Sequence, residues 1–417
     1  MQTRSIKLNS GHKKAIAIIC CVAALAALAV FAKWSFGHAI AAGAAEPEVA
    51  AFGRRLAGRD AEARFENGLL LEKTQLPGDD AAVREFRAAV SLSPHHYVYW
   101  LALGRSLEQW GDDAAAEQAI RNAAELAPNY ARVRWALGNL LLRQGRIDEA
   151  FAEIRKAAAA DPSYASPAAS AAWQTYGGDS RRIAEAVGDS PRISAALALL
   201  LAGEKRYSEA MGHWRSIEQG QITDSLAESG KALYGKLNEA GMYRSAIEVG
   251  SSVGLFSGVQ ADAITNGGFE DALATQDTHQ FTWAISGGAF PRIGLNDAQR
   301  HSGSYSLLVS FGQGGKGARQ IVQKAGVEAG GRYELRFHYR SELKPEGAGR
   351  IDVFAAGSSI AGSRLVSRAE WTEVQMPFTV PDGSEGIELR ITMDACSAES
   401  CPVTGSIWFD DFALIKL

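Results

Sequence analysis

Two short strings in the sequence have the residue types of enzyme active sites. Residues 250–254 read Gly-Ser-Ser-Val-Gly and place Ser252 in the pattern of a nucleophilic serine. That chemistry needs a strand before the serine and a helix after it, whereas a helical pattern precedes this serine and turn-rich sequence follows it. Gly312, Gly314 and Gly317 have the spacing of a dinucleotide-binding loop, but they lead into a second strand-like run and not into a helix that would bind phosphate. We therefore expect neither string to be catalytic.

The four cysteines form two pairs with different surroundings. Cys20 and Cys21 lie inside an apolar run, where we expect them to act as small hydrophobic residues. Cys396 and Cys401 flank a short polar loop, and such a pair is expected to form a local disulfide in an oxidising compartment. Zinc binding is disfavoured because no second cysteine pair and no histidines lie at close spacing. Two free thiols are the remaining alternative.

The N-terminal segment has the pattern of a membrane anchor. Residues 15–32 form an uncharged apolar run, about as long as a short membrane-spanning helix. The nearby basic residues are Arg4, Lys7, Lys13 and Lys14 before the run and Lys33 after it. This bias predicts that residues 1–14 are cytoplasmic and that the bulk of the chain lies outside the inner membrane, in the periplasm. The small residues at 42–45 allow a cleaved signal peptide as the rival, but the run is longer than most signal cores, which favours an uncleaved signal anchor.

The composition excludes one large class of partners. The chain has 417 residues and a net charge of −4, so it lacks the basic excess expected of a nucleic-acid-binding protein. Its length accommodates two or three domains.

Residues 94–162 repeat one pattern in a register of about 34 residues. Small residues recur where two antiparallel helices would touch, apolar residues fill the gaps, and a proline ends each second helix. The first copy contains Trp100, Leu103, Gly104, Ala116, Ile120, Ala123 and Pro128, and the second contains Arg134, Leu137, Gly138, Ala150, Ile154, Ala157 and Pro162. A partial copy precedes and looser pairs follow, which predicts roughly five or six stacked helix pairs over residues 61–253, because one pair cannot bury its own apolar stripe. Residues 33–60 are interpreted as a linker.

This pattern resembles the tetratricopeptide repeat. The resemblance implies an all-α solenoid that binds a protein partner along the first helix of each pair, on the concave side. The implied contact residues are Arg105, Glu108 and Gln109 in one copy and Trp135, Asn139 and Arg143 in the next. Trp135 is the expected anchor, since exposed aromatic residues are enriched at binding hot spots. The alternative is that Trp135 packs against the neighbouring repeat.

After about residue 250 the helical period gives way to alternation. Residues 332–340 alternate Tyr333, Leu335, Phe337 and Tyr339 with polar residues, a period of two that indicates a strand with one buried face. Similar runs occur at residues 305–311, 351–354, 373–380, 387–393 and 407–414. Many short strands at this spacing predict an all-β antiparallel sandwich over residues 261–417.

The order of motifs in this region resembles that of carbohydrate-binding modules of the family 4/9 type. The motifs lie at residues 266–270, Trp283, residues 302–309, 320–323 and 331–340, Trp371, and residues 378–380 and 407–414. The resemblance implies a jelly roll of the galactose-binding-like fold. It also implies a structural calcium ion held by Glu270, Asp410 and backbone oxygens near Gly268, which suits the preference of calcium for oxygen ligands. Ordinary surface hydrogen bonds of the two carboxylates are the alternative.

The same resemblance implies a glycan site on one sheet face. Its expected residues are Gln320, with Gln323 as an alternative, Arg336, His338 and Arg340, flanked by Arg350 and Asp352. Guanidinium and amide groups suit sugar hydroxyls or anionic sugars, although a solvated strand face would look the same. Trp283, Trp371 and Trp408 are expected mostly to pack in the core.

Together these features predict a non-catalytic, membrane-anchored extracytoplasmic scaffold. Its repeats dock a protein partner and its jelly roll binds a glycan, with envelope or exopolysaccharide assembly as the setting. One alternative is a glycan-active hydrolase or its accessory subunit, because paired glycosidase carboxylates have no fixed spacing in sequence. The other alternative is a scaffold that binds only proteins.

Overall fold

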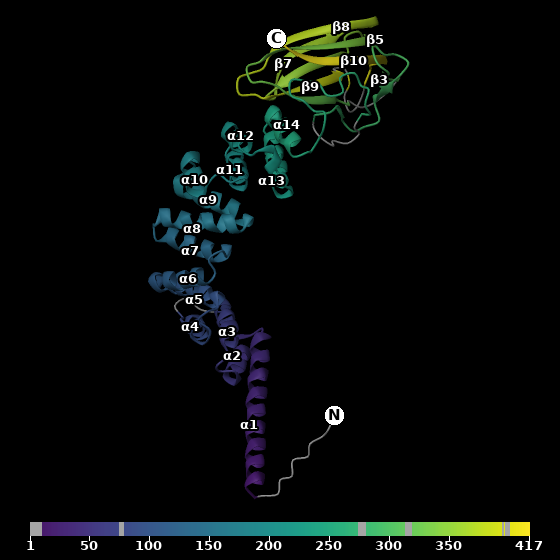
Figure 1. Cartoon of the computed structure of the whole chain (residues 1–417). Coiled ribbons are helices and arrows are strands. Elements are labelled where there is room, and N and C mark those ends of the chain that lie inside the picture. The colour runs from purple at the N-terminus through teal and green to yellow at the C-terminus, as the bar shows by residue number, and fades with distance from the viewer. Residues whose placement is uncertain (1–10, 75–78, 274–280, 313–318, 394–395, 397–400) are drawn as a thin grey trace. The chain divides into compact units, whose positions relative to one another are not determined.

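A computed structural model describes residues 11–74, 79–273, 281–312, 319–393, 396 and 401–417. Within these residues, fourteen α-helices are followed by a two-sheet antiparallel sandwich, as predicted (Figure 1). The chain divides into two compact units, Met1–Asp189 and Ser190–Leu417, which are described separately.

The first unit is entirely helical. Its helices are α1 (Gly11–Ala42), α2 (Pro47–Leu56), α3 (Ala61–Thr74), α4 (Ala81–Leu92), α5 (Tyr97–Trp110), α6 (Asp113–Leu126), α7 (Ala131–Arg143), α8 (Ile147–Ala160), α9 (Ala165–Tyr176) and α10 (Ser180–Val187). The predicted linker at 33–60 is therefore largely helical. Gly37 of α1 and Gly53 of α2 lie so close that a Cβ on either would sit 2.8 Å from the carbonyl oxygen of the other. This close approach packs the end of α1 against α2.

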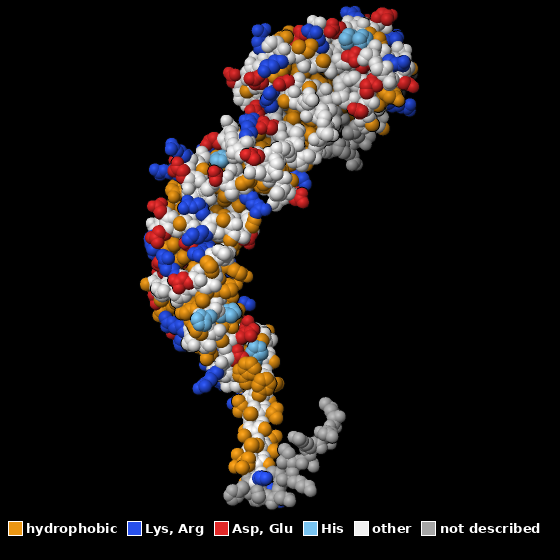
Figure 2. All heavy atoms as spheres, in the orientation of Figure 1, with side chains coloured by type: hydrophobic (Ala, Val, Ile, Leu, Met, Phe, Trp, Pro, Cys, Tyr) orange, Lys and Arg blue, Asp and Glu red, His pale blue; other side chains and the backbone are white. Residues whose placement is uncertain are grey.

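Most of α1 exposes an apolar surface. The segment Lys13–Ala42 is long and apolar enough to cross a membrane, and its most apolar stretch is not covered by other parts of the protein. Figure 2 shows this bare apolar helix as a column of hydrophobic side chains. An unpaired helix that is hydrophobic all round is typical of a membrane span.

The two full repeats pack in the same way. Gly104 of α5 lies on Ile120 of α6, and Gly138 of α7 lies on Ile154 of α8, so closely that a Cβ on either glycine would overlap the isoleucine. Trp100 in the first copy and Arg134 in the second occupy equivalent positions, and they play the same role. The Trp100 indole nitrogen donates to the carbonyl of Pro94 at 2.7 Å, and the Arg134 guanidinium donates to that of Pro128 at 2.7 Å.

The second unit contains two helix pairs and the sandwich. The helices are α11 (Pro191–Gly203), α12 (Tyr207–Arg215), α13 (Asp224–Glu239) and α14 (Tyr243–Ser252). One sheet has the order β1-β4-β9-β6-β7 and the other β2-β3-β10-β5-β8. The strands are β1 (Ala284–Ile285), β2 (Arg292–Asn296), β3 (Ser306–Phe311), β4 (Ile321–Gly326), β5 (Arg332–Ser341), β6 (Gly349–Ala355), β7 (Ser358–Leu365), β8 (Arg368–Thr379), β9 (Gly386–Met393) and β10 (Gly405–Lys416).

The core of the sandwich lies between the two sheets. Tyr333, Leu335, Phe337 and Tyr339 of β5 are all buried there, as the alternation predicts. Trp283 belongs to the same core, whereas Trp371 and Trp408 do not. Strand β10 carries a bulge after Asp410, where its pairing with β5 shifts.

Helix α14 is bonded to the sandwich. Arg244 forms an ion pair with Asp262 at 2.7 Å, and Asp262 also accepts a hydrogen bond from the Tyr333 hydroxyl at 2.5 Å. On the same helix, the Ser245 hydroxyl donates to Glu385 at 2.5 Å. These bonds hold α14 to the sandwich within the second unit.

Candidate functional site

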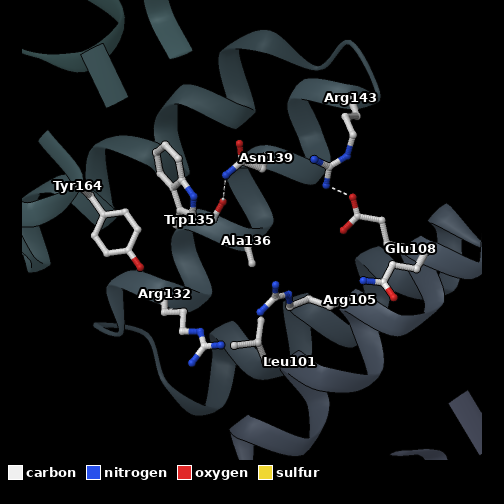
Figure 3. A pocket seen from close by; sticks show the side chains of 10 residues that line it. Leu101, Arg105, Glu108, Arg132, Trp135, Ala136, Asn139, Arg143 and Tyr164 are labelled. Atoms are coloured by element: carbon white, nitrogen blue, oxygen red, sulfur yellow. Dashed lines mark hydrogen bonds and ion pairs between the residues drawn. The ribbon is translucent and has the colours of Figure 1, made fainter. Parts of the chain in front are cut away.

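The predicted partner-binding residues of the repeats line one pocket. This pocket has a volume of about 730 Å³, and all of Arg105, Glu108, Gln109, Trp135, Asn139 and Arg143 line it, together with Leu101, Arg132, Ala136 and Tyr164 (Figure 3). The residues come from α5 and α7, the first helices of the two repeats, and from the turn after α8. Consecutive first helices lie side by side in such a stack, which is why residues one repeat apart meet in one groove.

Inside the pocket, polar contacts fix several side chains. Arg143 forms an ion pair with Glu108 across the two repeats. The Asn139 amide donates to the carbonyl of Trp135 at 2.9 Å. Trp135 is half-buried, and its ring lies 5.3 Å from that of Tyr164. The anchor predicted as an exposed aromatic is thus part of an aromatic pair at the wall of the groove.

The groove continues into a second, smaller pocket. This pocket of about 380 Å³ shares Leu101, Arg105 and Arg132 with the first. Its further lining residues are Phe65, Leu69, Glu72, Tyr97, Val98, Ala102 and Tyr130. Burial raises the pKa of Glu72, and the charge of Arg105 partly opposes this effect. The combined surface offers arginines beside aromatic and aliphatic side chains.

In the sandwich, the predicted glycan residues fall into two groups. Arg336, His338 and Arg340 alternate with the core residues of β5 and therefore share its outward face. Gln320 precedes β4, which belongs to the other sheet, so the structure does not bring it to this group. Gln323 is buried and donates to the carbonyls of Thr265 and Phe281.

The two residues expected to flank the glycan site also lie away from the outward face of β5. Arg350 and Asp352 lie on β6 of the opposite sheet, where the guanidinium donates to the carboxylate at 2.7 Å. Sequence alternation shows which residues of a strand share a face, but the pairing order of strands decides which sheet that face belongs to.

Two tryptophans add apolar surface to the outward face of β5. Trp408 of β10 is paired with Arg340, whose guanidinium lies 5.7 Å from the centre of the indole ring. Trp371 of β8 is half-buried and contacts His301, with ring centres 5.8 Å apart. Arg340 also donates to Gln299 at 2.6 Å and to Glu342 at 3.0 Å. This face therefore combines planar cations with indole rings.

The predicted calcium ligands converge on one loop. Glu270 accepts hydrogen bonds from the backbone amides of Ser304 and Tyr305, the shortest at 2.8 Å. Asp410 is fully buried and accepts bonds from the amides of His301 and Ser302 at 2.8 and 3.2 Å.

Gly268 lies close to Asp411, Asp410 and Glu270. A Cβ on Gly268 would be 4.0 Å from both the Glu270 Cγ and the Asp410 Oδ1 atoms. The structure thus brings the opening segment and the final strand to the same loop, where backbone amides bond both carboxylates, and calcium binding here stays a prediction.

Burial and hydrogen bonds together set the pKa values of Asp410 and Asp411 at this loop. Burial raises the pKa of Asp410, and the amides of His301 and Ser302 only partly offset it. Burial also acts to raise the pKa of Asp411, but hydrogen bonds from Ser302 and His301 outweigh it and leave that pKa below its usual value. The bulge therefore holds two adjacent carboxylates with opposite pKa shifts.

The remaining sequence candidates have structural roles or lie outside the description. Ser252 ends α14, donates to the Val249 carbonyl at 2.7 Å and accepts from the Trp214 indole, which is unlike the setting of a catalytic serine. Gly314 and Gly317 lie outside the described residues. Cys396 and Cys401 are joined by a disulfide.

Sequence reasoning missed several residues of these sites. Arg132 and Tyr164 line the repeat groove, and His301 and Asp411 adjoin the outward face of β5. Arg132 lies close to Trp135 on the first helix of the same repeat, so helical spacing in the sequence could have predicted that Arg132 also lines the groove. Nothing local in sequence places the loop of His301 over a strand that comes more than thirty residues later, since only the fold brings them together.

The helical repeats and the sandwich each match a known protein family. Residues 97–130 and 131–164 match the tetratricopeptide repeat, and residues 261–398 match a carbohydrate binding domain. No curated protein matches the sequence. The chain thus carries tetratricopeptide repeats and a carbohydrate-binding module with a jelly-roll fold.

Several solved structures are similar to parts of the chain. A structure described as "CBM4 structure and function" is 16% identical and covers 37% of this chain and 99% of its own, with a TM-score of 0.29. TmCBM61 in complex with beta-1,4-galactotriose is 16% identical and covers 36% of this chain and 96% of its own, with a TM-score of 0.28. MamA from Desulfovibrio magneticus RS-1 is 17% identical and covers 40% of this chain and 80% of its own, with a TM-score of 0.27.

Proposed function

We propose that this chain is a membrane-anchored extracytoplasmic scaffold that holds a protein partner in its repeat groove and a glycan on its jelly roll. The observation that carries the proposal is the first pocket, in which six residues implied by the repeat pattern meet. Both matched families are binding modules, which supports a non-catalytic role.

The chemistry of the groove favours an acidic peptide with an apolar anchor. The first pocket contains Arg105, Arg132 and Arg143 against a single glutamate, Glu108, which is already paired with Arg143. Arginine binds carboxylates through paired hydrogen bonds, and the resulting charge complementarity also directs the encounter. Trp135 and the apolar wall of the second pocket would receive the anchor.

The outward face of β5 supports the glycan half of the proposal. Trp371 and Trp408 can stack on sugar rings, while Arg336 and Arg340 can donate to hydroxyl or carboxylate oxygens. Both tryptophans are half-buried, so each presents a fixed edge or face without the entropy cost of ordering a flexible side chain.

Residues at the end of α1 support the membrane anchor. Trp34 and Phe36 of α1 are exposed, and so is Phe52 of α2. Aromatic side chains are enriched where a span leaves the membrane, since they have apolar bodies and tolerate headgroups. An inner-membrane anchor with the remaining chain in the periplasm would place the glycan site in the cell envelope, where polysaccharide assembly occurs.

Glycan-array binding by the detergent-solubilised chain tests this proposal. We expect binding of a defined glycan class that is lost in Trp408→Ala and retained in Trp110→Ala, an exposed tryptophan on α5. Turnover of the bound glycan would instead support the hydrolase alternative. Protein capture without any glycan binding would support a scaffold that binds only proteins.

A further inference from the structure

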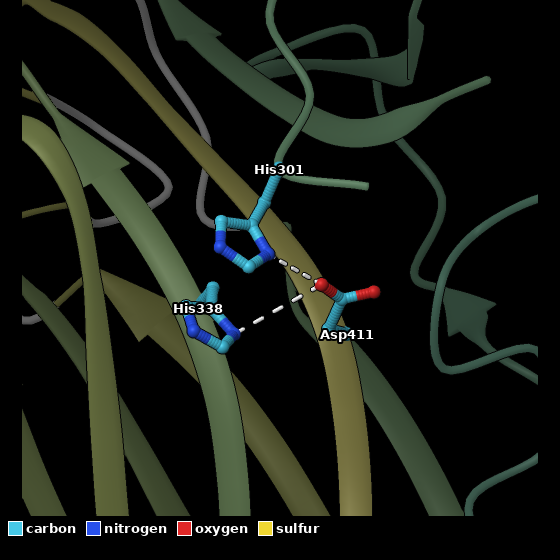
Figure 4. Close-up of side chains that lie close together, drawn as sticks. All are labelled: His301, His338 and Asp411. Atoms are coloured by element: carbon cyan, nitrogen blue, oxygen red, sulfur yellow. Dashed lines mark hydrogen bonds and ion pairs between the residues drawn. The ribbon is translucent and has the colours of Figure 1, made fainter. Parts of the chain in front are cut away.

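Two histidines and an aspartate form a cluster on the outward face of β5 and β10. His301 comes from the loop between β2 and β3, His338 from β5, and Asp411 from the β10 bulge (Figure 4). One donor atom from each residue lies within 4.8 Å of the other two. Neither His301 nor Asp411 is among the residues implied by the family resemblance.

A single carboxylate oxygen faces both imidazole rings. Asp411 Oδ2 lies 2.6 Å from His301 Nδ1 and 4.0 Å from His338 Nδ1. The two rings stack with their centres 3.7 Å apart and their planes inclined by 11°. Three potential ligand atoms therefore gather at one point.

The surrounding structure holds these groups independently of any ion. Asp411 Oδ1 accepts a hydrogen bond from the Ser302 hydroxyl at 2.6 Å, which leaves Oδ2 directed at the histidines. Asp411 has a positive φ of 53°, a conformation imposed by the bulge. The backbone amide of His301 donates to Asp410 at 2.8 Å and fixes the loop above β5. Such outer bonds are how proteins orient metal ligands.

One nitrogen of the cluster has no hydrogen-bond partner among the described residues, although it lies 4.0 Å from Asp411 Oδ2. His338 Nδ1 is shielded from solvent and forms no hydrogen bond with any residue in the described part of the chain. A buried polar atom without a partner costs free energy, so a ligand at this point would relieve that cost.

We propose that His301, His338 and Asp411 bind a divalent transition-metal ion, with zinc as the best match. Two imidazole nitrogens and one carboxylate are a donor set that zinc accepts, whereas calcium requires oxygen ligands. Zinc–ligand bonds of about 2.0–2.2 Å place donors roughly 3.3 Å apart in a tetrahedron. For zinc to bind, the direct contact between His301 Nδ1 and Asp411 Oδ2 at 2.6 Å must open, and the His338 ring must rotate toward Asp411 from 4.0 Å. Three protein ligands leave the fourth position to water.

This site uses other side chains than the calcium site implied for Glu270 and Asp410, but it adjoins that site through the loop of His301 and Ser302. The proposal does not depend on glycan binding. The experiment titrates zinc into the metal-stripped, detergent-solubilised full chain by calorimetry. We expect one equivalent to bind, and we expect His338→Gln to weaken the affinity at least about tenfold. His95→Gln, a change at an exposed histidine on the repeats, should bind as the wild type does.

Two further measurements keep the result unambiguous. If His338→Gln does not fold, as judged by circular dichroism, His301→Gln takes its place, because His301 contributes its bond to Asp410 through the backbone. Excess calcium should leave zinc binding unchanged. Equal zinc affinity in the wild type and in both histidine variants, or no binding by the wild type, would overturn the proposal.

Discussion

At the scale of single residues, the two repeats show that a structural role can outlast a change of residue type. Trp100 and Arg134 are chemically unlike, yet each donates to the carbonyl of the proline that ends the preceding helix. Both side chains are long and planar and carry an N–H at their edge. The role therefore depends on reach and on a donor, and the tryptophan of the first copy is replaceable.

The first prediction concerns the groove residue Trp135. Trp135→Ala should weaken binding of an acidic peptide selected from a library on the wild-type chain by about tenfold or more, since aromatic anchors dominate interface energies. The melting temperature should fall by only a few degrees, because Trp135 is half-buried and its ring contact with Tyr164 adds about 0.5–1.5 kcal/mol to the area it buries. Fluorescence anisotropy and calorimetry measure the two quantities.

The matched control for this change is Trp110→Ala. Trp110 is exposed at the end of α5 and is not among the residues that line the groove. The control should retain full peptide affinity. A large fall in melting temperature for Trp135→Ala, with unchanged affinity, would show that Trp135 is a packing residue.

At the scale of elements, the second prediction concerns calcium binding beside the β10 bulge. Asp410 on β10 and Glu270 in the opening segment hold the same loop, so a calcium ion at these carboxylates would tie the two ends of the sandwich. At a hundredfold excess over the dissociation constant, such an ion adds about 2.7 kcal/mol of stability. Calcium should then raise the melting temperature of the sandwich transition by several degrees, and chelator should reverse this.

Variants separate this response from zinc binding. Glu270→Gln should abolish the calcium response, whereas His338→Gln should leave it intact. An identical calorimetric midpoint in calcium and in chelator would show that the two carboxylates only bind backbone amides.

The third prediction concerns the link between α14 and the sandwich. Burial acts to raise the pKa of Asp262, but bonds from Tyr333 and Arg244 outweigh it and leave the pKa below its ordinary value of 3.8. A carboxyl with a lowered folded-state pKa stabilises the fold above the ordinary value and loses that contribution as pH falls through the folded-state pKa. Asp262→Asn should therefore cost about 1–2 kcal/mol at neutral pH and flatten the acid limb of the stability curve.

Asparagine suits this position because Asp262 has a positive φ of 60°, which asparagine tolerates. Denaturant unfolding between pH 2 and pH 7, a range of about five units around the ordinary carboxyl pKa, measures the effect. Asp382→Asn, a change at an exposed aspartate, serves as the control. Parallel stability curves for wild type and Asp262→Asn would contradict the proposed linkage.

At the scale of the whole molecule, the fourth prediction concerns topology. The exposed apolar helix and the basic residues before it predict a cytoplasmic N-terminus and an extracytoplasmic C-terminus. An alkaline-phosphatase-type reporter fused after Leu417 should be active, and a cytoplasm-dependent reporter at the same site should be silent. The reverse pattern would refute the orientation.

Local sequence patterns were enough to predict the helices and strands and their buried faces. Glycine, alanine and proline at a fixed register predicted the repeats, because close helix contacts admit only small residues and proline ends a helix. Alternation predicted the buried side of β5, because side chains in a strand point to opposite faces. These features depend on neighbours within a few residues, or on a register that the chain itself repeats.

Which distant residues meet became visible only in the folded molecule. It placed Gln320 and Arg350 on the sheet opposite Arg336, and it brought His301 onto His338 and Asp411. It also joined α14 to the sandwich through Arg244 and Asp262. The physical reason is that strand order and loop placement follow from how the whole core packs, and this information is spread over the chain rather than held in any local pattern.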